Sequence, residues 1–382
     1  MKGLTAIIPA AGLSSRVGRF KPLLPLDGGT VLSRCVRLFR TCGVERVVVV
    51  TGKRADEVAA CAMEAGAEAV HNAAFEQGMY SSVLTGVRAL EPDVDAFFML
   101  PADIPLVRPE TVTRLMDAYS RTRSTVLYPR FAGKRGHPPI IAAEVVPDIL
   151  AHDGSGGLRT VLSRFEAGAR DLDVADFGIS YDLDHLEDYE MALAVAGIGY
   201  PLADECRELF RLQGVSDHIR NHCRAVAAVA SALCERLNGR LDERRAAGTR
   251  VVRLDPGLVL GAALTHDIGK GTKRHEAAGA ELLRAHGFPA AADVVGAHFD
   301  VALADDAPIT EKEVVFLADK LVRCHGPVPL ADRYMEKVAM YRHEEGAEEA
   351  ILGRLGRARA VMDRFDREMA DSSERIAGQA LS

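Results

Sequence analysis

The feature that most constrains this chain is a change in its sequence pattern near residue 200. Before that point, short runs rich in Val, Ile, Leu, Phe and Thr alternate with amphipathic stretches such as Val31–Thr41. The clearest of these runs are Leu4–Pro9, Arg46–Thr51, Phe97–Leu100 and Thr125–Tyr128. Such alternation is typical of a mostly parallel sheet with helices on both faces, so we predict an α/β domain.

The strand pattern ends at a cluster formed by Gly197, Gly199 and Pro201. Residues 203–368 then read as one helix after another, with only Val251–Leu254 as a short extended piece. A length of 382 residues also favours two domains. We therefore predict three parts: an α/β domain over 1–197, an all-α domain over 203–345, and a C-terminal helix over 346–382 with a frayed tail.

Composition narrows the class of partner. The net charge of −7, from 47 basic and 54 acidic residues, gives no general attraction to nucleic acid or to an anionic membrane. The sequence has no apolar run near the ~20 residues of a membrane span. The seven cysteines form no Cys-x-x-Cys pair, which indicates buried free thiols in a reducing, cytoplasmic compartment.

The loop after the first apolar run is suited to phosphate. Its small residues Gly12, Ser14 and Ser15 can bring backbone N–H groups and hydroxyls close to a phosphate chain. Arg16 and Lys21 add two cations. The loop is not a Walker A motif, because no Lys-Ser/Thr pair follows its glycines. Taken alone, such a loop is more often an ordinary exposed turn.

Two acidic segments accompany this loop. An apolar run ends in Asp103, between Pro101 and Pro105, and a parallel sheet would place that carboxylate at the same edge as the loop. Asp184 stands at a second strand-to-helix junction, where its ordinary role would be a helix N-cap. Carboxylates beside bound phosphates are ligands for Mg²⁺. The ensemble therefore predicts a magnesium–phosphate site.

Five motifs in order carry a family resemblance. They are Ala10-Ala11-Gly12-Leu-Ser14-Ser15-Arg16-Val-Gly18 with Lys21, Gly78-Met-Tyr-Ser81-Ser82, Pro101-Ala-Asp103-Ile-Pro105, Gly136-His137-Pro138 and Asp182-Leu-Asp184. Through them residues 1–197 resemble the MobA-like NTP transferases of molybdenum-cofactor synthesis, which have a Rossmann-like nucleotidyltransferase fold. Ala-Ala-Gly in the first loop is similar to the cytidylyltransferase branch. His185 departs from the pattern, in which a small hydroxyl residue is common.

This resemblance implies a reaction and a nucleotide site. The reaction is transfer of CMP from CTP to molybdopterin, with Mg²⁺ and release of pyrophosphate. The residues implied to bind the nucleotide are Ala10, Ala11, Gly12, Ser14, Ser15, Arg16, Lys21, Ser81 and Ser82.

The resemblance also implies catalytic roles. Arg16 and Lys21 would neutralise charge that builds on the leaving pyrophosphate. Asp103 and Asp184 would hold Mg²⁺ on the reacting phosphates, and His137 would help seat the pterin substrate. Catalysis would then rest on positioning and charge neutralisation, without a covalent intermediate.

Histidine and aspartate are concentrated in the second half where helices are predicted. The candidates are His222, His266, Asp267, His275, His298 and Asp319. A single histidine on a helix is usually structural. The adjacent pair His266-Asp267, followed by Ile-Gly269-Lys270, is harder to explain in that way. Neighbouring imidazole and carboxylate groups can bind one ion.

A second resemblance covers roughly residues 203–345. The residues that carry it are His222, His266, Asp267, Lys270 and Asp319. They are similar to the HD phosphohydrolase superfamily, an all-helical fold, which implies metal-dependent phosphoester hydrolysis with Asp267 and Lys270 in the catalytic site. Imidazole and carboxylate ligands suit a divalent transition metal such as Mn²⁺, Fe²⁺, Co²⁺ or Ni²⁺. His275 and His298 match positions that hold a second metal.

Three alternatives remain open from the sequence. The first domain could be a cytidylyltransferase for another small phosphorylated substrate. It could instead be a carrier that delivers finished cofactor to a molybdenum hydroxylase apoenzyme, with the helical domain as a nucleotide sensor. The helical domain could also bind a nucleotide without hydrolysing it.

Overall fold

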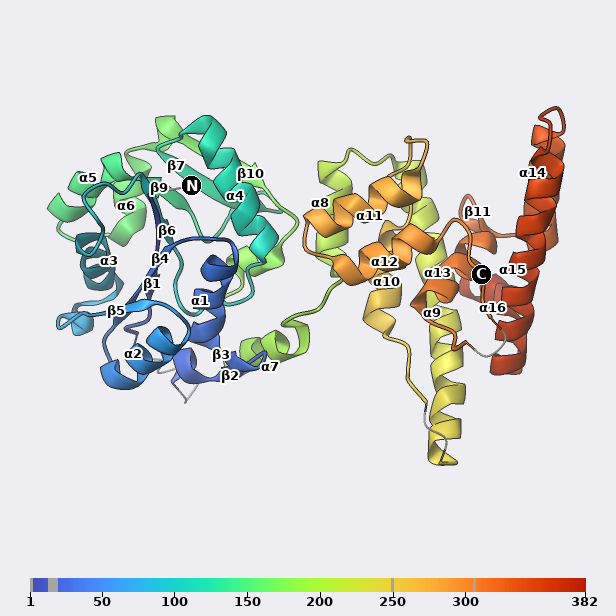
Figure 1. The fold of residues 1–382 in the computed structure, drawn as a ribbon, viewed down its shortest axis with the longest axis horizontal. Coiled ribbons are helices and arrows are strands. Elements are labelled where there is room, and N and C mark those ends of the chain that lie inside the picture. The colour runs from blue at the N-terminus through green and yellow to red at the C-terminus, as the bar shows by residue number, and fades with distance from the viewer. Residues whose placement is uncertain (1–2, 13–19, 249–250, 305–306) are drawn as a thin grey trace. The chain divides into compact units, whose positions relative to one another are not determined.

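The computed structural model describes residues 3–12, 20–248, 251–304 and 307–382. The chain divides into two compact units, Met1–Gly197 and Ile198–Ser382. The first is a sheet between helices and the second is almost entirely helical (Figure 1). The predicted architecture, a mostly parallel α/β domain followed by an all-α domain, is confirmed.

The first unit is built on an eight-stranded sheet of order β10-β7-β9-β6-β1-β4-β5, with β8 paired to β7. The strands are β1 (Leu4–Pro9), β4 (Arg46–Thr51), β5 (Glu68–His71), β6 (Ala96–Met99), β7 (Val126–Phe131), β8 (Lys134–Arg135), β9 (Ile140–Ala142) and β10 (Ala169–Asp173). Strand β1 pairs in parallel with β4 and β6, and β9 runs antiparallel to its neighbours. The central strands are buried on both sides, which explains their continuous apolar runs.

Helices cover both faces of this sheet (Figure 1). Their bounds are α1 (Val31–Thr41), α2 (Ala55–Glu64), α3 (Met79–Arg88), α4 (Pro109–Thr122), α5 (Val146–Ala151), α6 (Gly157–Ser163) and α7 (Leu186–Val195). Along β1, Ala6 and Ile8 pack in the core under α1, α2 and α4, whereas Ile7 packs in the core under α3, α5 and α6. This two-residue alternation is what a strand sandwiched between helix layers requires.

The sheet register brings two of the predicted motifs together. Strands β1 and β6 are parallel neighbours, so their carboxyl ends lie at one edge. There the backbone N–H of Ala102 donates to the carbonyl of Pro9 at 3.1 Å. Asp103 directly follows Ala102, and Gly12 lies three residues after Pro9, so ligands at the strand ends would meet both segments.

The second unit is a set of helices around one long central helix. Its elements are α8 (Ala203–Leu212), α9 (Asp217–Ala246), α10 (Pro256–Thr265), α11 (His275–Ala285), α12 (Pro289–Ala297), α13 (Glu311–Lys320), α14 (Leu330–Tyr341), α15 (Ala347–Met369), α16 (Ser373–Ala380) and the hairpin β11 (Val322–Arg323) and β12 (Gly326–Pro327). Helix α9 packs against α10, α13, α15 and α16. Residues 251–254 form no strand.

Two sequence-based expectations are wrong in detail. The tail from Asp371 does not fray: α16 packs against α9 and buries Ile376 and Ala377, and its N-cap Ser372 accepts a hydrogen bond from the N–H of Arg375. All seven cysteines are free, yet Cys324 is exposed because it lies in the β11–β12 turn. None of the helices in the described part of the chain is both long and apolar enough to cross a membrane.

Candidate functional site

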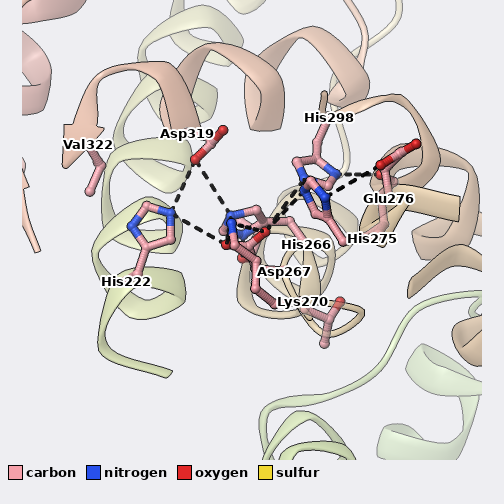
Figure 2. Close-up of polar contacts among 12 residues, drawn as sticks. His222, His266, Asp267, Lys270, His275, Glu276, His298, Asp319 and Val322 are labelled. Carbon is pink, nitrogen blue, oxygen red and sulfur yellow. Dashed lines mark hydrogen bonds and ion pairs between the residues drawn. The ribbon is translucent and has the colours of Figure 1, made fainter. Parts of the chain in front are cut away.

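In the helical unit, helix ends bring six candidate metal ligands into two adjoining groups (Figure 2). His222 lies near the start of α9, and His266 and Asp267 directly follow α10. His275 begins α11, His298 directly follows α12, and Asp319 lies near the end of α13. The two groups are His222, His266 and Asp319, and Asp267, His275 and His298. Five helices thus contribute to one cluster that is far from continuous in sequence.

In the first group, two imidazoles face one carboxylate. Nε2 of His222 lies 3.2 Å from Oδ1 of Asp319, and Nε2 of His266 lies 3.7 Å from the same oxygen. Two imidazole nitrogens and a carboxylate oxygen converge, which is a suitable donor set for a divalent transition metal.

Asp267 joins the two groups. Its Oδ2 lies 3.8 Å from Nε2 of His266, while its Oδ1 lies 3.5 Å from Nε2 of His275 and 3.8 Å from Nε2 of His298. The two Nε2 atoms of His275 and His298 are themselves 3.2 Å apart. Asp267 therefore offers one oxygen to each group, as a carboxylate shared by two ions would.

Backbone carbonyls fix the orientation of three imidazoles. The Nδ1–H of His222 donates to the carbonyl of Cys324 at 2.9 Å. In the same way, His266 donates to the carbonyl of Ala263 at 2.8 Å, and His298 donates to that of Val295 at 2.6 Å. With the proton on Nδ1, each Nε2 keeps its lone pair for a ligand.

The nitrogen of His266 gives the strongest sign of fit to a metal. Its Nε2 is buried and has no hydrogen-bond partner among the residues that the structure describes. A buried polar atom left unsatisfied is costly, and a metal ion is a suitable partner for it. The residues present therefore fit the metal that the family resemblance implies.

Burial and charge set the protonation states that a metal needs. Burial lowers the pKa of His266, and lowers that of His298 to about 3, so both imidazoles are neutral at neutral pH. Burial opposes ionisation of Asp319, but Lys320 and His222 outweigh it and hold the pKa of that carboxyl well below its usual range. Neutral imidazole and ionised carboxylate are the forms that bind metal.

Two positioning residues were missed from the sequence. Nζ of Lys320 lies 2.6 Å from Oδ2 of Asp319, and Nη2 of Arg333 lies 3.3 Å from Oδ1. Adjacency to Asp319 in the sequence could have pointed to Lys320, whereas Arg333 reaches it only through tertiary packing. Nζ of Lys270, which was predicted to lie in the catalytic site, is 3.0 Å from Oδ2 of Asp267.

At the sheet edge of the first unit, a small pocket of about 90 Å³ lies at the start of the loop that was predicted to bind phosphate. Gly12, Lys21, Met79 and Asp103 are among its lining residues. Ala10, which also lines the pocket, and Ala11 are buried, whereas Gly12 is exposed. The predicted contacts of Ser14, Ser15 and Arg16 fall outside the described residues.

Charged groups at this edge partly neutralise one another. Nζ of Lys21 lies 3.1 Å from Oδ1 of Asp184, so Asp184 faces the site and His185 takes the N-cap position of α7. The N–H of Leu183 donates to the carbonyl of Asp103 at 2.9 Å, which ties the two acidic segments together. Burial raises the pKa of Asp103, although Lys21 opposes that rise.

Ser81 and Ser82 lie in the first turn of α3, which begins at Met79 directly after Gly78. Gly78 has φ of 97°, a left-handed conformation that suits glycine. The side chain of Asn72 donates to Ser81 at 2.8 Å and to Ser82 at 3.1 Å. Asn72, which was not predicted, therefore positions both hydroxyls.

His137 lies under this edge. Its Nδ1 is 3.3 Å from the carbonyl of Met99, at the end of β6, and burial lowers its pKa. The backbone N–H of His137 donates to the carbonyl oxygen of Ile179 at 2.7 Å. A Cβ atom added at Gly136 would lie 2.4 Å from this carbonyl oxygen of Ile179, so the close approach requires glycine before His137.

Known proteins match the two units separately. The MobA-like NTP transferase domain family matches residues 6–170, and the HD domain family matches residues 219–324. The chain belongs to the MobA-like NTP transferase family. In this family member, an HD domain follows the transferase domain.

The curated relatives of this MobA-like protein align with its first half. The molybdenum cofactor cytidylyltransferase of Escherichia coli (strain K12) is 26% identical over 191 residues, 50% of this chain and 95% of that protein. Nicotine blue oxidoreductase of Paenarthrobacter nicotinovorans is 30% identical over 192 residues, 48% of this chain and 93% of that protein. The crystal structure of Rv0371c from Mycobacterium tuberculosis H37Rv covers 50% of this chain and 98% of its own, at 26% identity and a TM-score of 0.45.

Proposed function

We propose that the MobA-like domain transfers CMP from CTP to molybdopterin and releases pyrophosphate. The observation that carries this proposal is the sheet edge where Lys21, Asp103 and Asp184 lie beside an exposed Gly12. Similarity to the E. coli molybdenum cofactor cytidylyltransferase supports this acceptor.

The residues act by position and charge. The acceptor phosphate attacks the α-phosphorus of CTP, a new P–O–P link forms, and the bond to the β-phosphate breaks. Lys21, with Arg16, neutralises the leaving pyrophosphate. Asp103 and Asp184 would hold Mg²⁺, which would supply positive charge to the phosphates when bound. For Lys21 to reach the nucleotide, its ion pair with Asp184 must open or be shared.

For the HD domain we propose hydrolysis of a phosphoester. The convergence of six ligands around Asp267, with inward-facing Nε2 atoms, carries this proposal. When bound, a transition metal would supply Lewis acidity that makes a phosphoester easier to attack and water easier to deprotonate. Lys270 would exchange its contact with Asp267 for one with the phosphate.

The first test is pyrophosphate release by the full chain with Mg²⁺ and molybdopterin, with CTP, GTP and ATP offered in parallel. Release with CTP alone, dependent on molybdopterin, is the expected result. If no pyrophosphate is released with any of the three nucleotides while the molybdopterin is active, this substrate assignment is wrong. Hydrolysis by the HD domain is tested on phosphomonoesters and phosphodiesters with Mn²⁺, and no metal-dependent turnover of any of them would reject it.

A second candidate for the first domain is a cytidylyltransferase acting on another small phosphorylated acceptor. An acceptor other than molybdopterin is favoured by similarity to a 3-deoxy-manno-octulosonate cytidylyltransferase of Chelativorans sp. (strain BNC1), which is 33% identical over 108 residues, 28% of this chain and 42% of that protein. CTP-dependent pyrophosphate release with a sugar or alcohol phosphate, and none with molybdopterin, would establish it. A cofactor carrier would instead retain its function in cells after Asp103→Ala.

A further inference from the structure

Four cationic side chains gather around Asp319 in the HD domain. Lys320 and Arg333 contact its carboxylate directly. Lys337 lies one helical turn after Arg333 on α14 and so shares its face. Arg354 comes from α15, which packs against α14. Of these four cations, only Lys320 and Arg333 contact a candidate metal ligand, Asp319.

Lys337 and Arg354 have no anionic partner. Within the described residues, neither forms an ion pair or a hydrogen bond. Nζ of Lys337 instead lies 5.7 Å from the ring centroid of Tyr334, and the guanidinium of Arg354 lies 5.6 Å from that of Phe299. Both side chains are partly buried, so water does not fully compensate the missing counter-charge.

The charge balance around these side chains is positive. Burial and the neighbouring Lys320 and Arg333 lower the pKa of Lys337 to about 8. Two acids act on this region: Asp300, which is paired with Arg357, and Asp319, whose carboxylate is already taken up by Lys320, Arg333 and the ligand histidines. Like charges held together at a partly buried site cost free energy, and a bound anion would remove that cost.

Arg354 is held next to the metal-ligand cluster. The ring on which it lies, Phe299, directly follows His298 and is 6.2 Å from the ring of His275, centroid to centroid. Lys337 is close enough to both Asp319 and Arg354 for electrostatic interaction. Lys337 and Arg354 therefore both border the ligand cluster, Lys337 through its interaction with Asp319 and Arg354 through the ring that follows His298.

We propose that Lys337 and Arg354 form an anion subsite of the HD domain that binds a second phosphate group of its substrate. The substrate class is then an organic phosphoester with at least two phosphates, such as a nucleoside diphosphate, and not a simple monophosphate. Arginine can bind a phosphate in a bidentate manner and lysine acts as a point charge, so the pair suits this task. This inference rests on the hydrolase function proposed above.

The test uses the full chain with excess Mn²⁺ and calorimetric titration of AMP and ADP, which differ by one phosphate. We expect ADP to bind about tenfold more tightly than AMP, in line with charge-assisted hydrogen bonds to one added phosphate. The double variant Lys337→Gln/Arg354→Gln should lose most of this preference and keep its AMP affinity within about twofold. Lys337→Arg should retain the preference, since it keeps the charge.

Matched controls separate this subsite from general charge and from folding. Lys312→Gln and Arg359→Gln remove exposed cations from α13 and α15 and should leave the preference unchanged. Nucleotide bound by the MobA-like domain contributes equally to wild type and variants. A melting temperature close to wild type shows that each variant is folded, and the two single variants replace the double variant if it is not.

Three results would overturn the subsite: no preference for ADP in the wild type, an unchanged preference in the variants, or equal losses for AMP and ADP. Failure of the hydrolase proposal is distinguishable. In that case no phosphoester is turned over, while the Lys337- and Arg354-dependent preference for ADP persists.

Discussion

The two candidate sites differ in how much of each is already assembled. In the HD domain, backbone carbonyls orient His222, His266 and His298, and Lys320 and Arg333 hold Asp319. All of these groups are largely buried. A donor set built in this way is pre-organised for an ion that stays with the protein.

At the sheet edge of the MobA-like domain, the acidic side chains are held by fewer polar contacts. Asp184 pairs with Lys21, the very cation that we assign to the nucleotide, and Asp103 has a raised pKa because of burial. Two carboxylates without imidazole suit Mg²⁺, which usually keeps several waters and binds through substrate phosphates. From this difference we predict that the HD site keeps a resident metal, whereas the transferase site is completed only when a metal–nucleotide complex binds.

The largest effect should come from Asp267→Ala, because Asp267 offers one oxygen to each ligand group. We expect the purified protein to lose most bound Mn²⁺ and phosphoester hydrolysis to fall on the order of 1000-fold. Pyrophosphate release by the first domain should not change. Metal analysis and both assays on one preparation check this, and retention of full metal content would refute the shared role of Asp267.

The reciprocal variant is Asp103→Asn, which keeps the shape of the side chain but removes its charge. CTP-dependent pyrophosphate release should fall on the order of 100-fold, since a charge that organises the phosphates is lost. The Mn²⁺ content of the HD domain should match wild type. A parallel fall in both activities would show that the two sites are not independent.

Metal removal should distinguish resident from arriving metal. At an ion concentration about 100-fold above the dissociation constant, binding stabilises a fold by about 2.7 kcal/mol. For a unit of this size, chelation should therefore lower its melting temperature by roughly 5–10 °C. Calorimetry should assign this shift to the HD transition and leave the MobA-like transition in place. Equal shifts in both transitions would contradict the distinction.

Arg333→Ala tests whether support around a ligand matters as we infer. Loss of its contact with Asp319 should weaken Mn²⁺ binding about tenfold, as is usual for residues that orient a metal ligand. The control is Arg323→Ala, which removes an exposed arginine paired with Glu336 in the same region. Identical Mn²⁺ affinity in both variants would mean that Arg333 contributes only to packing.

Sequence patterns predicted the fold well where local structure decides it. The bounds of α1, Val31–Thr41, and of β1 and β4 agree with the periodicity of their apolar residues. The polar composition after Asp371 concealed α16, because only two of its apolar residues, Ile376 and Ala377, pack against α9. A short helix stabilised mainly by tertiary contact leaves a weak signal in sequence.

The same limit applies to the candidate sites. The family resemblance marked all six candidate ligands in the sequence, and the fold brings these residues together. The resemblance did not identify the residues that position another side chain. Arg333 and Asn72 reach their partners across separate elements, so neither spacing nor residue type singled them out.

The smallest effect in this series concerns two buried asparagines, one in each domain. Asn72 donates to Ser81 and Ser82, and Asn238 bridges the N–H and carbonyl of Leu254. Changing either to Ala leaves buried polar groups unpaired, at a cost of about 1–3 kcal/mol in stability.

Only Asn72→Ala should also alter the transferase, because it releases serines that we assign to the nucleotide. We expect its KM for CTP, measured by pyrophosphate release, to rise about threefold because the two hydroxyl groups are no longer held in position. Asn238→Ala should destabilise the HD domain and leave KM for CTP unchanged. If both variants shift KM equally, Ser81 and Ser82 have no particular role in binding CTP, and the sheet edge works through its charges alone.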